Sequence, residues 1–169
     1  MFTEDGEYKG LKFTALSAGS VVSMVKIDGS PNVSVQYSFN GRNWFPFTIS
    51  SDQIVLSNVD DYVYFSAADN GNQIFMDGWA SNGDPKTTHF MFSGSVRASG
   101  NCMSLLDNTV QQDYFTKYSA LGGIFSNTSA LVDVSGLLLP CTSLYNDSYT
   151  CMFYKCVSLS SIENLELPA

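Results

Sequence analysis

The chain has 169 residues, of which 44% are apolar, and its formal net charge is −8. This length suits one domain of ordinary size or two small ones, and no run approaches the ~20 apolar residues that a membrane-spanning helix requires. Because phosphate contacts dominate affinity for nucleic acids, the acidic excess disfavours a nucleic-acid-binding function.

The first hundred residues alternate short apolar runs with turn signals, which is the pattern of short β-strands. Seven or eight strands at regular spacing predict an antiparallel β-sandwich over residues 1–98. The expected strands cover residues 11–16, 21–27, 33–39, 44–49, 53–56, 62–67, 73–76 and 89–96.

The strands expected at 33–39 and 44–49 carry the clearest local signal. Apolar residues occupy every second position of 33–39, as in a half-buried strand. The Asn40-Gly41 pair that follows is a strong hairpin signal. Pro46 lacks a backbone N–H and is expected at a sheet edge or in a bulge.

The pattern changes near Ser99, where an internal repeat begins. Segment 124–140 aligns with segment 152–168 without gaps, which gives a 28-residue period. The aligned segments share five identities, where about one is expected by chance, and a period in this range is typical of stacked repeats. We therefore predict a second domain over 99–169 with about two units, 112–139 and 140–167.

Each unit has the pattern of one short helix followed by one strand. Apolar residues at i, i+3, i+4 and i+7 predict the helix, and the segment L-x-x-[V/I]-x-x-L-x-L-P after it predicts the strand. One helix plus one strand per unit is typical of leucine-rich repeats. Because two units rarely fold alone, we expect the sandwich to cap one end of the array. At the other end, either the array is cut at Ala169 or a partner subunit covers its open face. The helical positions are Leu121, Ile124, Phe125 and Thr128, then Tyr149, Met152, Phe153 and Cys156.

These segments resemble the repeat of BspA-type leucine-rich-repeat surface proteins. The resemblance rests on the motifs LPCTSL (139–144), MFYKCVSL (152–159) and ELPA (166–169). Cys156 falls on the regular cysteine of that motif, whereas Lys155 replaces its glycine, Cys141 replaces the alanine after proline, and the first unit has Thr128 at the cysteine position.

The upstream segments VQYSFNGRNWFPFTI (35–49), DYVYFSA (61–67) and FMFSGSVRASGNCMSLLD (90–107) resemble the β-domain that precedes such repeats in surface proteins of gut bacteria and of their phages. The resemblance covers roughly residues 8–169. It implies adhesion or display and brings no catalytic residues with it.

Enzyme motifs are absent from the sequence, and we predict a non-enzymatic protein. His89, the single histidine, lies in an expected strand without an obvious partner, so we expect it to be structural. The cysteines show no C-x-x-C pair, which argues against zinc, and we expect mostly buried thiols. They are Cys102, Cys141, Cys151 and Cys156.

The polar segment 70–86 is the longest expected loop. Asp69, Asp77 and Asp84 lie in or beside it and offer oxygen ligands that calcium accepts. Their spacing fits no EF-hand, and such residues are common in turns. We therefore predict no metal and no other cofactor, and keep these three as the residues to test for calcium.

Aromatic side chains are the remaining candidates for binding. Trp79 lies in the same glycine-rich loop, where an exposed indole stacks on a sugar or a partner and a buried one plugs the end of the sandwich. Tyr145, Tyr149 and Tyr154 enrich the repeat surface. Tyrosine-rich surfaces of low charge suit protein contacts, and equally suit solvent-facing helix positions.

Two functions remain open. The first is a structural or adhesion module of a phage virion, such as a decoration, fibre or attachment protein at the virion surface. The second is an adhesin or glycan-binding module at a bacterial cell surface. The first is favoured by the acidic N-terminus, which lacks the pattern of a signal peptide, by a native Met1 and by the thiols. The second is favoured by the better-known bacterial location of the family that the chain resembles. We expect a homo-oligomer, with a trimer as candidate, that contacts itself through the 137–169 end or the tyrosine-rich helices.

Overall fold

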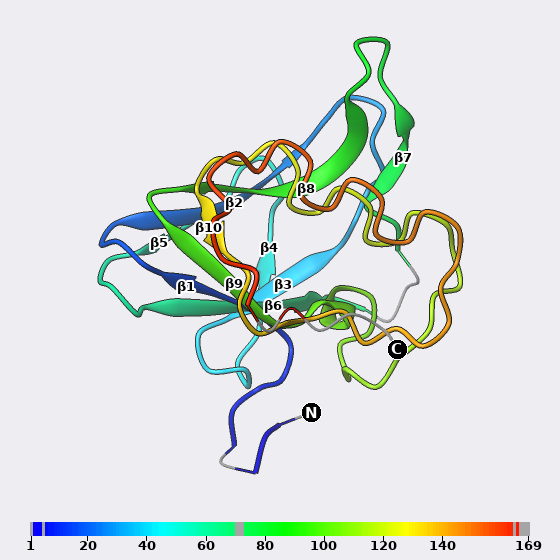
Figure 1. The fold of residues 1–169 in the computed structure, drawn as a ribbon. Coiled ribbons are helices and arrows are strands. Elements are labelled where there is room, and N and C mark those ends of the chain that lie inside the picture. The colour runs from blue at the N-terminus through cyan, green and yellow to red at the C-terminus, as the bar shows by residue number, and fades with distance from the viewer. Residues whose placement is uncertain (1, 5, 70–72, 164, 166–169) are drawn as a thin grey trace.

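The computed structural model describes residues 2–4, 6–69, 73–163 and 165. Nearly all of its regular structure is β, and a single short 3-10 helix, η1, occurs in the described part (Figure 1). The elements in chain order are β1 (Leu11–Ala15), β2 (Ser20–Lys26), β3 (Val35–Ser38), β4 (Phe45–Phe47), β5 (Gln53–Leu56), β6 (Tyr62–Ala67), β7 (Met76–Trp79), β8 (Pro85–Ser93), β9 (Val96–Asn101), η1 (Cys102–Leu105), β10 (Leu131–Asp133) and β11 (Leu137–Leu138).

The strands form two sheets, which confirms the prediction of a mainly β fold. The larger sheet has the order β10-β9-β1-β6-β3-β4, with β11 also paired to β9, and the smaller has the order β5-β2-β8-β7. Phenylalanines from both sheets meet in the core, where the ring of Phe90 on β8 lies 4.7 Å from that of Phe13 on β1 and 5.0 Å from that of Phe65 on β6. Edge-to-face packing of this kind stabilises the contact beyond area burial.

Most strands expected in the first hundred residues are present. The bounds of β5 and β6 agree with the prediction, and β3 pairs with β4 across the Asn40-Gly41 turn. Pro46 lies in β4 at the edge of the larger sheet, as predicted. The larger sheet is not purely antiparallel, however, because β10 and β11 run parallel to β9.

The expected strand at 89–96 is wrong, because the structure has β8 and β9 there with a turn between them. Gly94 adopts a φ of +81°, which L side chains rarely adopt, and a Cβ at this position would lie 2.6 Å from the Ser20 hydroxyl. The same hydroxyl accepts a hydrogen bond from the Ser95 N–H. The chain therefore reverses direction where the apolar pattern alone indicated a continuous strand.

The helices predicted in the repeats are also wrong. Residues 118–127 and 146–155 instead form two runs of consecutive turns, which we call the first and second turn runs. Positive φ values recur at every fourth residue and at equivalent places in both runs, at 119, 123 and 127 and then at 147, 151 and 155. A right-handed helix does not tolerate such values.

Stacking between the units explains why turns replace helices. Alternate N–H groups of the first turn run donate to carbonyls of the second, as in Leu121 N to Ser148 O and Phe125 N to Met152 O. In a helix those donors would bond within their own segment. The two runs consequently lie side by side as parallel zigzags (Figure 1).

Each unit of the repeat is thus one turn run followed by a short extended segment. We call residues 115–139 the first coil and residues 143–163 the second coil. The first coil stacks on the sheets, since the N–H groups of Phe90 and Val96 donate to the carbonyls of Ile124 and Ala130. The second coil stacks on the first. The ELPA motif at 166–169 lies outside the described residues.

The core is continuous from the sheets into the coils. One cluster of buried side chains includes Phe13 and Phe90 of the sheets together with Phe125, Leu131 and Met152 of the coils. The domain boundary predicted at 98/99 falls within β9, and the division into two domains stays a prediction.

All four cysteines are free thiols, with Cys102 and Cys141 buried. Burial raises the pKa of the Cys102 thiol and, to about 11, that of Cys156. No helix in the described part of the chain is long and apolar enough to span a membrane.

Candidate functional site

A hollow at the junction of the sheets and the coils contains Trp79. It has a volume of about 240 Å³ and is lined by residues of β7 and of both coils. We call it the Trp79 hollow. The indole of Trp79 is 51% exposed, so it does not plug the end of the sheets. Besides Trp79 the lining residues are Met76, Asp77, Gly78, Tyr118, Ser119, Asp147 and Thr150.

The polar groups of the hollow are partly ordered by contacts with one another. The Tyr118 hydroxyl donates to Asp77 Oδ1 at 3.2 Å, and the negative charge of Asp77 raises the pKa of that hydroxyl. The Thr150 hydroxyl donates to Asp147 Oδ1 at 3.2 Å. The hollow therefore combines two aromatic side chains with two carboxylates and contains no cationic side chain among its lining residues.

The β7–β8 hairpin contacts the second coil through Asp84, the residue directly before β8. Asp84 Oδ1 accepts a hydrogen bond from the Tyr154 hydroxyl at 3.2 Å and lies 2.8 Å from Lys155 Nζ. The hydrogen bond and charge of Lys155 lower the pKa of Asp84. Tyr154 is therefore half-buried and holds the hairpin against the coil.

The other two tyrosines proposed from the sequence lie in different surroundings. Tyr145 is exposed at the start of the second coil. The ring of Tyr149 packs edge-on against Phe115 at 5.1 Å, and its hydroxyl is buried without a hydrogen-bond partner in the described structure. Tyr145 is thus accessible to a partner, whereas the Tyr149 hydroxyl faces the interior.

The residues considered for calcium do not converge. Asp77 lines the Trp79 hollow and Asp84 contacts the second coil, while Asp69 is exposed just after β6. Residues 70–72 of the same loop lie outside the described part. Among the described residues, no group of three or more histidine, cysteine or acidic side chains is placed to hold a metal ion.

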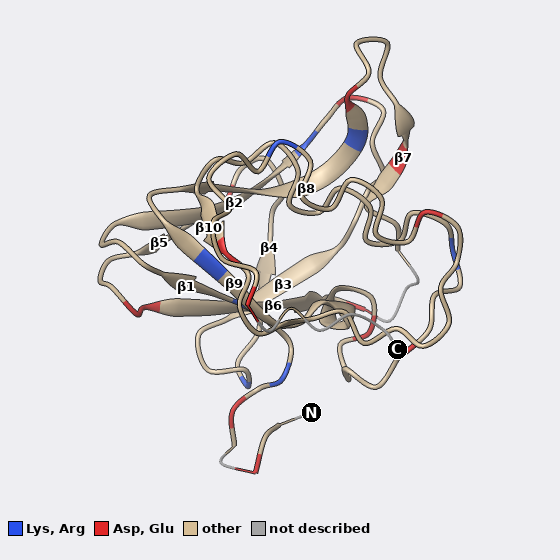
Figure 2. Ribbon diagram, viewed as in Figure 1, with Lys and Arg blue, Asp and Glu red and all other residues tan. Residues whose placement is uncertain are grey.

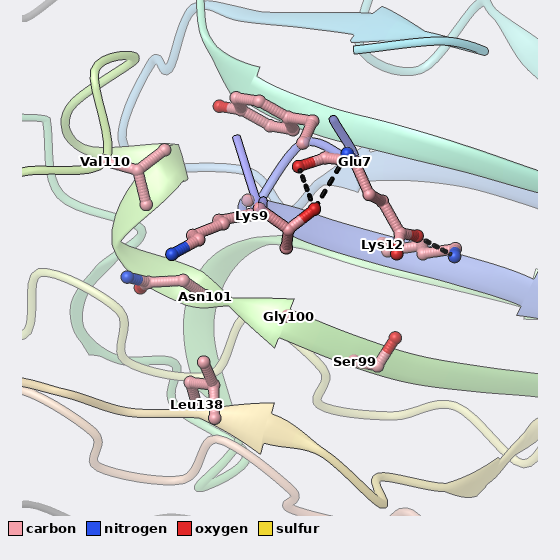
Figure 3. Close-up of a pocket in the computed structure, with 11 residues that line it drawn as sticks. Glu7, Lys9, Lys12, Ser99, Gly100, Asn101, Val110 and Leu138 are labelled. Carbon is pink, nitrogen blue, oxygen red and sulfur yellow. Dashed lines mark hydrogen bonds and ion pairs between the residues drawn. The ribbon is translucent and has the colours of Figure 1, made fainter. Parts of the chain in front are cut away.

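A second cleft of about 450 Å³ lies between the N-terminal segment and β9. Figure 3 shows Lys9 and Asn101 at one end of it and the ion pair of Glu7 with Lys12, 2.5 Å apart, at the other. Glu7 also accepts a hydrogen bond from the Tyr64 hydroxyl at 2.9 Å. The carboxylate of Glu7 thus offsets the charge of Lys12, so the cleft presents Lys9 as its one unbalanced charge among the lining residues.

The outer edge of the second coil has an unusual polarity. In the first turn run, the N–H groups at 119, 121, 123, 125 and 127 donate to the second coil. The N–H groups 28 residues later, in the second turn run, make no hydrogen bond to any described residue. We call this row the donor edge. Its members are the N–H groups of Asp147, Tyr149, Cys151, Phe153 and Lys155.

The carbonyls that alternate with the donor edge are already used. Even-numbered carbonyls from 146 to 154 accept from the first coil, and odd-numbered ones from 145 to 153 accept within the turns. An ordinary strand edge presents donors and acceptors in alternation. The donor edge presents N–H groups only.

Exposed apolar side chains precede and follow the donor edge in the sequence. Leu144, Tyr145 and Val157 are exposed, and Val157 is 80% exposed. The equivalent positions of the first coil, which are exposed as well, carry Thr116, Lys117 and Ser129. The second coil is therefore apolar where the first coil is polar.

His89 is not positioned as a catalytic base. It is buried on β8, and its Nδ1 lies 2.8 Å from the Thr87 hydroxyl. Burial lowers its pKa. A buried, uncharged imidazole bonded to a threonine fits the structural role expected from the sequence.

The chain has eight Lys and Arg residues against sixteen Asp and Glu residues, a balance that does not favour a polyanion as partner (Figure 2). Sequence reasoning identified Trp79 and Asp77 but missed Tyr118, Asp147 and Thr150, which complete the hollow from the coils. Their only signal is the 28-residue period, and the period does not reveal that the hairpin lies against the coils.

Comparisons with known proteins give no match to this chain, whether to a family model, to a curated protein or to a solved structure. The resemblance to BspA-type repeat proteins is therefore not tested by them.

Proposed function

We propose that the chain is a non-enzymatic structural or adhesion module that assembles through the donor edge of its second coil. The observation that carries this proposal is the row of five N–H groups that make no hydrogen bond to a described residue, with exposed apolar side chains before and after the row in the sequence. Free N–H groups at a sheet-like edge are a template for pairing with another chain. Exposed apolar groups around them add the area that an interface needs.

The occupant that we propose is a second copy of this chain in a head-to-tail arrangement. Two identical donor edges cannot pair with each other through their backbones, because each would present N–H groups to N–H groups. This argues against a two-fold dimer, in which the same patch meets itself. A head-to-tail interface that closes gives a ring, so a cyclic homo-oligomer such as a trimer suits the edge.

The setting that we propose is the surface of a phage virion, with a bacterial cell surface as the alternative. The resemblance of residues 8–169 to repeat surface proteins supports both settings. The free thiols support the first, because virion proteins fold inside the host cell, where thiols stay reduced. In either setting the coils would act as a contact platform and the sheets as its support.

Mass measurement by light scattering or sedimentation over a range of concentrations tests the assembly. We expect the mass of the unmodified chain to rise above that of a monomer. Val157 follows the donor edge by two residues, and Ile162 is a second exposed apolar residue of the second coil. Val157→Asp and Ile162→Asp place charges on this apolar surface, and each should keep the chain monomeric. Val59→Asp is the matched control, since Val59 is similarly exposed in the loop after β5.

The control variant should assemble like the unmodified chain. A monomeric mass for the unmodified chain at every concentration would contradict the proposal. So would assembly that survives Ile162→Asp and Val157→Asp combined.

A further inference from the structure

The Trp79 side chain is directed outward by an irregularity in β7. The pairing of β7 with β8 shifts register between Met76 and Trp79. Bulges of this kind often redirect a side chain next to a binding site. An indole left half in solvent presents an apolar face and an N–H on which a ligand can pack.

A second aromatic ring borders the same hollow. Tyr118 of the first coil is 46% exposed, and its hydroxyl is held by Asp77 on β7. The ring positions are thus fixed from two separate elements, a strand and a coil. At about 240 Å³ the hollow is smaller than the ~300–1,000 Å³ of sites for drug-sized ligands. Its size suits a single small ring.

The polar groups of the hollow suit hydroxyl groups. One oxygen of Asp77 accepts from Tyr118, and the other, which makes no hydrogen bond to a described residue, can accept from a ligand. Asp147 and Thr150 add a second carboxylate and a hydroxyl oxygen. A ring with an apolar face and several hydroxyls at its rim would use the indole and these oxygens together. The two carboxylates would repel an acidic ligand.

We propose that the Trp79 hollow binds a neutral sugar ring, such as an unsubstituted hexose unit of a surface glycan. The apolar face of the ring lies on Trp79 and its hydroxyls donate to Asp77 and Asp147. The site borders the assembly contact, because Asp147 contributes its side chain to the hollow and its N–H to the donor edge, whereas the two aromatic side chains come from β7 and the first coil. Trp79→Ala therefore tests sugar binding without altering the donor edge, and Val157→Asp tests assembly without altering the lining of the hollow.

Titration of the chain with methyl glycosides of glucose, galactose and mannose tests the site, with two-dimensional NMR spectra as the readout. We expect saturable shifts for at least one of them at the indole N–H of Trp79 and not at that of Trp44, the other tryptophan. Trp79→Ala should weaken binding about tenfold or more. Tyr118→Phe should weaken it less, because the ring remains and only its bond to Asp77 is lost.

Phe45→Ala is the matched control, because Phe45 is an aromatic residue of similar exposure on β4, and it should bind like the unmodified chain. The folded state of each variant is checked by its amide spectrum. Glucuronic acid should bind more weakly than the neutral sugars. The proposal is overturned if no neutral sugar gives saturable shifts. It is also overturned if calcium or choline binds at the hollow and the sugars do not.

Discussion

The two coils have the same backbone and different surroundings. The first lies between the sheets and the second coil, and its side chains Leu121, Ile124 and Phe125 are fully buried. The equivalent residues of the second coil include Tyr149 and Phe153, which are only partly buried. Positive φ values recur at the same places in both. The backbone therefore follows from the repeat, whereas burial depends on whether a further layer covers the coil.

The largest difference between the coils should appear on removing a core ring from each. Phe125→Ala empties a fully buried site, and we expect a loss of ~3–5 kcal/mol in the free energy of unfolding. Phe153, whose ring stacks on Phe125 at 5.7 Å, is partly exposed, so Phe153→Ala should lose only ~1–2 kcal/mol. Denaturant unfolding measures both. Equal losses would show that the second coil is as well covered as the first.

Backbone conformation offers a second comparison at equivalent positions. Gly123 has a φ of +63°, and a Cβ there would lie 2.3 Å from Cγ2 of Thr87. We expect Gly123→Ala to lose more than ~1 kcal/mol from strain and this clash. Cys151, the equivalent residue of the second coil, has a φ of +57° with a side chain already present.

Cys151→Gly removes the strain of a side chain at positive φ, so the free energy of unfolding should stay unchanged or rise by up to ~1 kcal/mol. Thermal and denaturant unfolding measure the change in the free energy of unfolding for Gly123→Ala and Cys151→Gly. A destabilised Cys151→Gly would mean that the thiol contributes packing that outweighs the strain.

Lowering the pH should reduce the stability of the folded chain through His89, which lies near the first coil. The imidazole is bonded to Thr87, whose hydroxyl lies 3.3 Å from that of Ser126 in the first coil. Burial lowers the pKa of His89, so between that pKa and the ordinary value of about 6.5 the unfolded chain binds a proton that the folded chain does not. Stability should be full above about pH 6.5 and decline as the pH falls below it.

His89 is the only histidine, so His89→Gln should remove this slope. Unfolding measured at intervals from pH 7.5 to 5 provides the check. If the free energy of unfolding of His89→Gln still declines as the pH falls, another titrating group causes the decline.

The smallest effect is expected at the ion pair of Asp84 with Lys155, which ties the second coil to the β7–β8 hairpin. Exposed ion pairs contribute little, because water and salt screen them. Asp84→Asn should leave the melting temperature unchanged at physiological ionic strength. A clear fall would show that the hairpin contact helps to hold the second coil in place.

Local sequence signals predict the strands well and the coils only in part. Asn40-Gly41 and the alternation before it predict the β3–β4 hairpin, because turn type and burial pattern are local properties. The 28-residue period predicts the stacking of two units. It does not predict turn runs, because apolar spacing at 149, 152, 153 and 156 suits a helix equally well. The deciding interaction, Leu121 N to Ser148 O, joins separate units.

The site is less predictable than the fold. Trp79 is identified by its residue type, but its neighbours Tyr118 and Thr150 come from coils that no local pattern places beside β7. Tyr149 shows the converse, since a tyrosine expected at the surface packs against Phe115. Which side chain of a repeat faces outward depends on the layers above and below it.

Amide hydrogen exchange at increasing protein concentration tests the donor edge most directly. In dilute solution the N–H groups of Tyr149, Cys151 and Phe153 should exchange fast, while those of Leu121, Gly123 and Phe125 exchange slowly. At concentrations where the chain assembles, the first set should become protected and the second should not change. Fast exchange of the first set at every concentration would contradict assembly through this edge.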